Sequence, residues 1–126
     1  MDNKAAVVEE IRSFIAKKNQ RRRENLEQLY KSACRDFTDI CKIIIEKYNP
    51  TALWQWGSLL DQKHFSEISD IDIALEGVVE TAVFFQILRD TERMTSFPLD
   101  IIQLEAVEPV FAAKIKQNGK VIYERG

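Results

Sequence analysis

Two aspartates separated by one isoleucine, Asp70-Ile71-Asp72, stand inside a run of alternating apolar and polar residues that ends at Leu75. Alternation of this kind predicts a β-strand whose successive side chains point to opposite faces. Asp70 and Asp72 therefore project from the same face, about 6–7 Å apart along the backbone. Their carboxylate oxygens can turn inward from there to share a hard cation such as Mg²⁺.

Two further pieces of the chain fit a site that holds metal and phosphate. Gly57-Ser58 follows a short apolar stretch, and a glycine lets the backbone approach a phosphate while a serine adds a hydroxyl donor. Asp100 stands among apolar residues in a later segment, and we expect that segment to be a largely buried strand. A carboxylate in such a place costs several kcal/mol unless a partner such as a metal compensates it. We therefore predict one metal-phosphate site built from two strands and a Gly-Ser turn.

Length and composition narrow the class of protein. The chain has 126 residues, enough for one domain with a hydrophobic core but too few for two. A net charge of -2 gives no support to a nucleic-acid-binding function. No apolar run approaches the ~20 residues of a membrane span, and the polar N-terminus is unlike a signal peptide, so we expect a cytoplasmic protein. Cys34 and Cys41 share one face of a predicted helix, where small buried residues are expected rather than a disulfide.

The hydrophobic periods predict an α/β (α+β) fold, a small mixed β-sheet with helices on one face, preceded by a two-helix N-terminal extension. The extension would comprise residues 1–49 and the core residues 50–126, so that removal of residues 1–47 would spare the core. Residues 17–25, KKNQRRREN, could be a connection between two helices or a solvated stretch of a single long one. Asn49-Pro50 and Asn118-Gly119 are expected to end helices. The predicted strands are 51–56, 71–75, 99–104 and 121–123, and the predicted helices are 4–18, 26–49, 79–94 and 107–116.

Taken together, Gly57-Ser58, the segment Ser69–Leu75 and the later Asp100 resemble the nucleotidyltransferase superfamily typified by DNA polymerase beta. The small size looks like the minimal branch of that superfamily. The resemblance covers residues 51–126 and includes the closing FAAKIKQNGKVIYERG, which is similar to the helix-glycine-strand ending of those proteins.

This resemblance implies a set of site residues. It assigns catalysis and metal binding to three carboxylates: Asp70, Asp72 and Asp100. In that set, Asp100 also helps to activate the attacking hydroxyl. The resemblance assigns the nucleotide to a glycine and two serines: Gly57, Ser58 and Ser69. Because phosphoryl transfer depends mainly on neutralising negative charge, a two-metal Mg²⁺ site is expected.

The function implied by the resemblance is Mg²⁺-dependent transfer of a nucleoside monophosphate, AMP above all, from a nucleoside triphosphate such as ATP onto a hydroxyl acceptor. Minimal nucleotidyltransferases commonly pair with a HEPN-type toxin and act as its antitoxin by modifying a tyrosine. We expect the acceptor to be such a partner protein, with no membrane and no nucleic acid involved. The N-terminal helices could pack on the sheet, bind a partner or form a homo-oligomer.

One departure from the family pattern keeps a second function open. Leu59-Leu60-Asp61 follows Ser58, where the minimal branch often has an arginine that meets phosphate; Lys63 or His64 could take its place. Without such a group the protein could be an inactive module that neutralises or scaffolds a partner by contact. Transfer to a small molecule is a third alternative, but relatives of that kind usually carry an additional substrate domain.

Other conspicuous residues have ordinary structural interpretations. Trp54 and Trp56 alternate on the first predicted strand and are expected to pack in the core, with base stacking as the alternative. His64 is expected to be exposed, and the Arg21–Arg23 run to be a solvated helix face.

Overall fold

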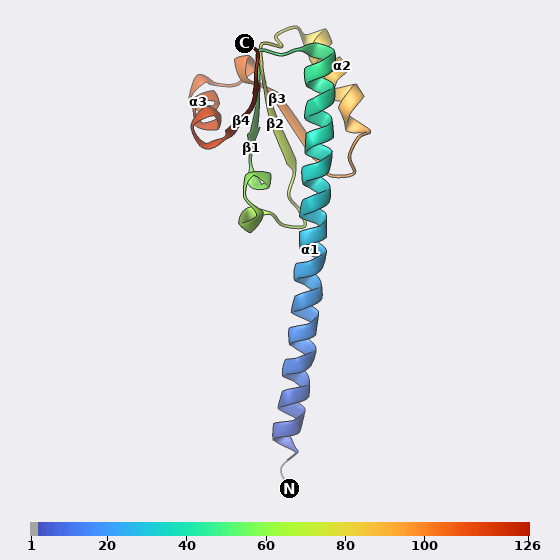
Figure 1. Cartoon of the computed structure of the whole chain (residues 1–126). Coiled ribbons are helices and arrows are strands. Elements are labelled where there is room, and N and C mark those ends of the chain that lie inside the picture. Colours follow the sequence, from blue (N-terminus) through green and yellow to red (C-terminus); the bar gives the residue numbers. More distant parts are fainter. Residues whose placement is uncertain (1–2) are drawn as a thin grey trace.

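The computed structural model describes residues 3–126, which fold around one four-stranded sheet (Figure 1). Three α-helices accompany the sheet within this range. The elements in chain order are α1 (Lys4–Tyr48), β1 (Ala52–Trp56), β2 (Ile71–Glu76), α2 (Thr81–Glu92), β3 (Leu99–Gln103), α3 (Pro109–Asn118) and β4 (Lys120–Glu124). Short 3₁₀ turns, η1 (Ser58–Leu60) and η2 (Gln62–His64), occupy the connection between β1 and β2. The predicted mixed α/β class is confirmed.

The sheet has the strand order β3-β2-β1-β4. β1 lies antiparallel to both of its neighbours, while β2 and β3 run parallel and are joined through α2. The parallel register places Asp72 directly beside Asp100, and the antiparallel register places Trp56 beside Asp72 on the other side. Three neighbouring strands thus bring these residues into one row across the sheet.

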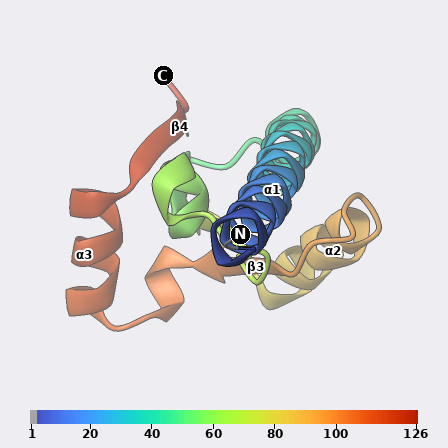
Figure 2. The same ribbon diagram turned by 90° about the horizontal axis from the view of Figure 1, so that it is seen from below.

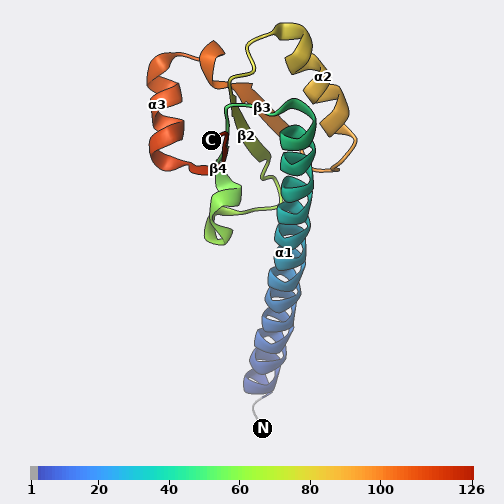
Figure 3. The ribbon, with the colours of Figure 1, turned by 45° about the horizontal axis from the view of Figure 1, so that its top comes forward.

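Helices cover both faces of the sheet, not one face as the sequence had suggested. Ile71, Ile73 and Leu75 point toward α1 and α2 in the larger core cluster. Ala74, between them on β2, points to the other face and packs with Ile115 of α3. Figures 2 and 3 show α3 on one side of the sheet and the pair α1 and α2 on the other. The two-residue period of β2 predicted its two faces, but it does not say which helix returns to which face.

The N-terminal extension is one helix of 45 residues, so the prediction of two helices is wrong. Residues 17–25 continue the helix because they contain no proline or glycine and consist mostly of good helix formers, namely lysine, glutamine, arginine and glutamate. The helix ends as predicted at Asn49, which adopts a left-handed conformation (φ 44°) and is followed by Pro50.

The two halves of α1 have different environments. In the C-terminal half, five side chains are buried in the larger core cluster: Ala33, Phe37, Ile40, Cys41 and Ile44. Lys47 Nζ binds Asp90 Oδ2 of α2 at 2.7 Å, and Tyr48 donates a hydrogen bond to the same carboxylate. The N-terminal half, residues 4–25, projects away from the sheet and is exposed along its length (Figure 1).

The two cysteines of α1, Cys34 and Cys41, are free, and Cys41 is buried. Burial raises the pKa of Cys41 to about 12, so this thiol stays protonated. No helix in the described part of the chain is both long enough and apolar enough to span a membrane.

Candidate active site

The turn after β1 lies directly against the acidic strand. Gly57 has φ +83°, a backbone conformation that residues with a side chain rarely adopt. A Cβ built there would lie 2.0 Å from Asp72 Oδ2. Only glycine therefore fits this position. Ser58 then begins η1, and the buried Leu59 anchors that turn in the larger core cluster. The structure thus brings the predicted Gly-Ser turn and the carboxylate of Asp72 together.

Asp72 is the buried carboxylate of the site. Asp72 is 8% exposed, and its two neighbours along β2, Ile71 and Ile73, are fully buried. Burial, followed by the negative charges of Asp100 and Asp70, raises the pKa of Asp72 to about 6. Each of these causes disfavours the ionised form, and no hydrogen bond from residues 3–126 offsets them. An ionised Asp72 is therefore a high-energy group that a cation would stabilise.

The other two carboxylates are exposed. Asp70 comes directly before β2, and Asp100 lies on β3. The expectation that Asp100 is buried is wrong, because β3 is an edge strand and its fully buried side chain, Ile101, lies on the opposite face. The burial argument for a metal applies to Asp72 instead. Asp100 still shares the sheet face of Asp72, at the distance of neighbouring strands, about 4.8 Å.

The three carboxylates do not form a closed metal cage. Within residues 3–126, no group of three or more His, Cys, Asp or Glu side chains is gathered closely enough to hold a metal ion. This openness fits Mg²⁺, which proteins usually bind through one or two carboxylates while waters and substrate phosphates complete the shell. The uncompensated carboxylate of Asp72, with Asp100 beside it, supplies oxygen ligands of that kind.

Ser69 has a structural role in the turn before β2. Its hydroxyl accepts a hydrogen bond from the Ser66 backbone N–H at 2.8 Å, and the Ser69 N–H donates to the Ser66 carbonyl at 3.1 Å. This reciprocal pair fixes the turn that delivers Asp70 to the site. A direct contact between Ser69 and a nucleotide stays a prediction.

The loop after Ser58 exposes His64 to solvent. The His64 side chain is 75% exposed, as predicted, and its Nδ1 lies 3.1 Å from Asp61 Oδ2. Asp61 also accepts the Lys63 backbone N–H at 3.0 Å, which caps η2. These contacts explain the local shape of the loop and leave its two predicted phosphate-binding candidates, Lys63 and His64, without an observed contact to Gly57 or Ser58.

A different lysine lines a hollow beside the turn. The hollow has a volume of about 200 Å³, and Lys114 and Asn118 of α3 line it together with Gly57. Trp56 forms one wall and meets Phe111 edge-on at 5.8 Å between ring centroids. Sequence reasoning missed Lys114 because nothing in the local pattern of a helix near the C-terminus indicates contact with a turn after β1.

The two tryptophans pack in the core, as predicted, and the helix they meet there is α3. Trp54 and Trp56 both belong to the partly buried apolar groups around the smaller core cluster. Their indole Nε1 atoms are buried without a hydrogen-bond partner in the described part of the chain. They lie on the same face of the sheet as Asp72, on the neighbouring strand β1.

The sequence of the chain decides its family. Residues 38–126 match the profile of the family described as "Polymerase beta, Nucleotidyltransferase". The chain belongs to this nucleotidyltransferase family. The match confirms the resemblance read from the Gly-Ser turn and the aspartates, and it begins inside α1 rather than after it.

Solved structures with the same fold include toxin-antitoxin pairs. The chain is similar to one in the crystal structure of the toxin-antitoxin MntA-HepT, with a TM-score of 0.54 at 15% identity over 71% of each chain. It is also similar to a chain of a toxin-antitoxin structure with AMP-PNP, with a TM-score of 0.59 at 17% identity over 71% of this chain and 73% of that one. No curated protein matches the chain significantly. At these identities the structural likeness shows the nucleotidyltransferase fold.

Proposed function

We propose that this nucleotidyltransferase transfers AMP from ATP to a hydroxyl group of a partner protein, in a reaction that depends on Mg²⁺. The observation that carries the proposal is the buried, uncompensated carboxylate of Asp72 against the Gly57 turn. A structural aspartate in that place would be expected to have a hydrogen-bond donor or a basic partner. An aspartate that binds a cation needs neither, because the cation compensates its charge.

The residues divide into two groups by role. Asp70, Asp72 and Asp100 would hold Mg²⁺, at a two-metal site that the triphosphate completes. Gly57 and Ser58 offer backbone N–H groups and a hydroxyl to the phosphates, and Ser69 stays in this set as a prediction. Bound magnesium would supply charge neutralisation on the triphosphate and on the departing pyrophosphate.

The chemistry is a single displacement at the α-phosphorus of ATP. The acceptor oxygen forms a bond to that phosphorus, the bond from phosphorus to the oxygen bridging the α- and β-phosphates breaks, and pyrophosphate leaves. The hydroxyl proton passes to the carboxylate of Asp100, which is exposed and can release it to water. Because Asp100 is exposed at the edge of the sheet, a side chain of a separate folded protein can reach it as the acceptor.

The partner we propose is a HEPN-type toxin, with this chain as its antitoxin and a tyrosine as the acceptor. Support comes from the fold shared with chains of toxin-antitoxin structures, one of them with AMP-PNP, a close analogue of the proposed donor. We propose a cytoplasmic location for the pair, where ATP is available.

The experiment follows the phosphorus atoms of ATP. A lysate of the native host is incubated with the protein and with ATP labelled at the α- or the γ-phosphate. We expect a protein band labelled from α-labelled ATP but not from γ-labelled ATP, and no band with Asp72→Asn. Labelling from the γ-phosphate would indicate a kinase contaminant. Absence of label from both would favour the inactive module that acts by contact.

Binding of Mg²⁺ and ATP should depend on pH through Asp72. Because the carboxylate must be ionised to attract the cation, affinity should fall about tenfold for each pH unit below its pKa of about 6 and level off above pH 7. Titration calorimetry between pH 5 and pH 8 measures this, with protein-free titrations of Mg²⁺ into ATP as correction for protonation of the nucleotide itself. An affinity that does not change across this range would contradict the assignment.

Lys114 should provide the basic contact that the loop after Ser58 lacks. A charge-assisted hydrogen bond to phosphate contributes about 1.5–3 kcal/mol, so Lys114→Ala should raise the KM for ATP about ten- to a hundredfold. Lys114→Arg should restore most of the loss. Lys116→Ala is the matched control, since Lys116 lies on the same helix but pairs with Glu76 at 3.1 Å. Equal KM values for Lys114→Ala and Lys116→Ala would remove Lys114 from the site.

A further inference from the structure

The projecting half of α1 carries an apolar stripe that the described part of the molecule does not cover. Its residues recur at three- and four-residue steps and are between 45% and 67% exposed: Val7, Val8, Ile11, Phe14 and Ile15. Scattered exposed apolar residues are common, but a stripe along one side of a projecting helix is typical of a helix that packs against another. In proteins most helical stability comes from the packing of such an apolar face.

The stripe continues the face by which α1 packs on the sheet. At 100° per residue, its mean direction lies within about 60° of the mean direction of Phe37, Ile40 and Ile44, which are buried in the core. The apolar side of α1 therefore runs along the whole helix. The body of the molecule covers its C-terminal half, and a second element is needed for its N-terminal half.

The charges of the projecting half indicate what that element is. Its two acidic residues before position 20, Glu9 and Glu10, lie near its N-terminal end, where Lys4 and Arg12 balance them, whereas the basic Lys17, Lys18 and Arg21–Arg23 lie near the body. Two such helices side by side in parallel would place both basic ends together. In the antiparallel arrangement, Glu9 and Glu10 of each helix lie toward the basic end of the other, which is the favourable pairing.

We propose that residues 4–25 of two copies of this chain form an antiparallel two-helix coiled coil. Ile11 of each copy would pack beside Phe14 of the other, which places the centre of the stripe at the twofold axis. Glu10 and Lys17 lie on the same flank of the stripe, so each Glu10 would face a Lys17 across the interface, twice in the dimer. The two active sites would lie at opposite ends of the pair and remain open.

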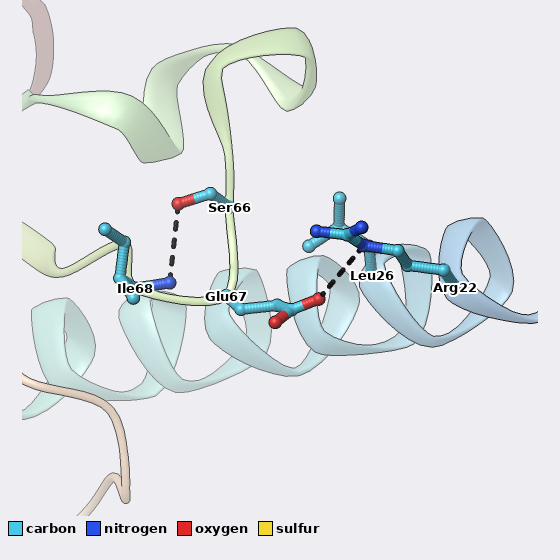
Figure 4. A pocket seen from close by; sticks show the side chains of 5 residues that line it. All are labelled: Arg22, Leu26, Ser66, Glu67 and Ile68. Carbon is cyan, nitrogen blue, oxygen red and sulfur yellow. Dashed lines mark hydrogen bonds and ion pairs between the residues drawn. The ribbon is translucent and has the colours of Figure 1, made fainter. Parts of the chain in front are cut away.

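The two paired helices would overlap as far as the point where α1 meets the body of the molecule. In this register the first turn of one helix reaches the level of Arg22 of the other copy. There α1 meets the body at a hollow of about 250 Å³, where Arg22 Nε lies 3.6 Å from Glu67 Oε1 (Figure 4). Leu26 and Ile68 also line this hollow, and Ile68 is 88% exposed. The hollow would receive the end of the partner helix, and the pairing stops where the body begins.

Sedimentation velocity of the full chain tests the dimer, at concentrations from about 5 to about 200 µM because association follows mass action. We expect a dimer at the upper end of this range and a monomer for Phe14→Glu. Ser13→Glu is the matched control, an equal charge on the opposite side of the same turn, and should leave the dimer intact. A wild-type monomer throughout, or a Phe14→Glu variant that remains dimeric, would overturn the proposal.

A charge exchange tests the antiparallel register. Glu10→Lys and Lys17→Glu should each weaken self-association about tenfold, because each replaces two attractive pairs by two repulsive ones. Mixed in equal amounts, the two variants should form a heterodimer of near wild-type affinity, since both pairs are then opposite in sign. Failure of the mixture to associate more tightly than either variant alone would exclude the antiparallel pairing.

Discussion

Replacement of Asp72 by asparagine is expected to abolish nucleotide transfer and, at the same time, to make the protein more stable at pH 7. The raised pKa of about 6 means that folding favours the protonated carboxyl, so the ionised carboxylate at pH 7 costs about 2–3 kcal/mol of folding free energy. Asparagine has nearly the same shape but no charge. It removes this cost together with the attraction for Mg²⁺, so thermal unfolding should shift upward by about 5–10 °C.

The pH dependence of this gain identifies its cause. Stability of the wild type should decline from pH 4 to pH 6, because in this range Asp72 has lost its proton in the unfolded state and still holds it in the folded state, and the variant should not share this decline. The two proteins should therefore unfold at similar temperatures near pH 4, diverge as the pH rises to 6, and keep a constant difference above it. Asp39→Asn, at an exposed position of α1, is the matched control and should change neither stability nor transfer. A destabilised Asp72→Asn variant that still transfers AMP would refute the assigned role.

Removal of residues 1–47 is expected to unfold the protein, while removal of residues 1–24 is expected to leave the fold intact. The longer deletion takes away the five buried side chains of α1, including Phe37, Ile40 and Ile44. Burial of such groups stabilises the fold by roughly 10 kcal/mol in total, comparable to the whole stability of a small domain. Of the described residues, the shorter deletion removes only 3–24, which are exposed, and it keeps Leu26.

Circular dichroism and thermal melting distinguish these results. The chain that begins at Asn25 should show a cooperative transition close to that of the full chain and should sediment as a monomer. The chain that begins at Tyr48 should lack such a transition. We therefore propose that the boundary between extension and core lies inside α1, near Asn25, rather than at residue 49. A cooperatively folded product of the longer deletion would restore the original boundary.

The strands and their facing residues were predictable because their signals are local. Alternation in β2 predicted that Asp72 and Ala74 lie on one face and Ile71, Ile73 on the other, which the two core clusters confirm. A proline after Asn49 predicted the end of α1. The Gly-Ser turn and the spacing of the aspartates were enough to indicate the family that the sequence match then showed.

Other features depend on contacts between distant parts of the chain. Nothing local says that β3 is an edge strand, so Asp100 was expected to be buried when it is exposed. Nor does α3 reveal in its own sequence that it covers the second face and brings Lys114 to Gly57. The sequence left open whether α1 is one helix or two, because a polar stretch without glycine or proline is compatible with both a loop and a helix.

Calorimetric titration of the purified protein with ATP, with and without Mg²⁺, tests whether Asp72 forms a cation-dependent nucleotide site, with Asp72→Asn as the control. We expect binding that requires Mg²⁺ in the wild type and is lost in the variant, while the variant remains folded by thermal melting. Binding of equal strength with and without Mg²⁺, or in the wild type and the variant, would contradict a cation-dependent nucleotide site at Asp72.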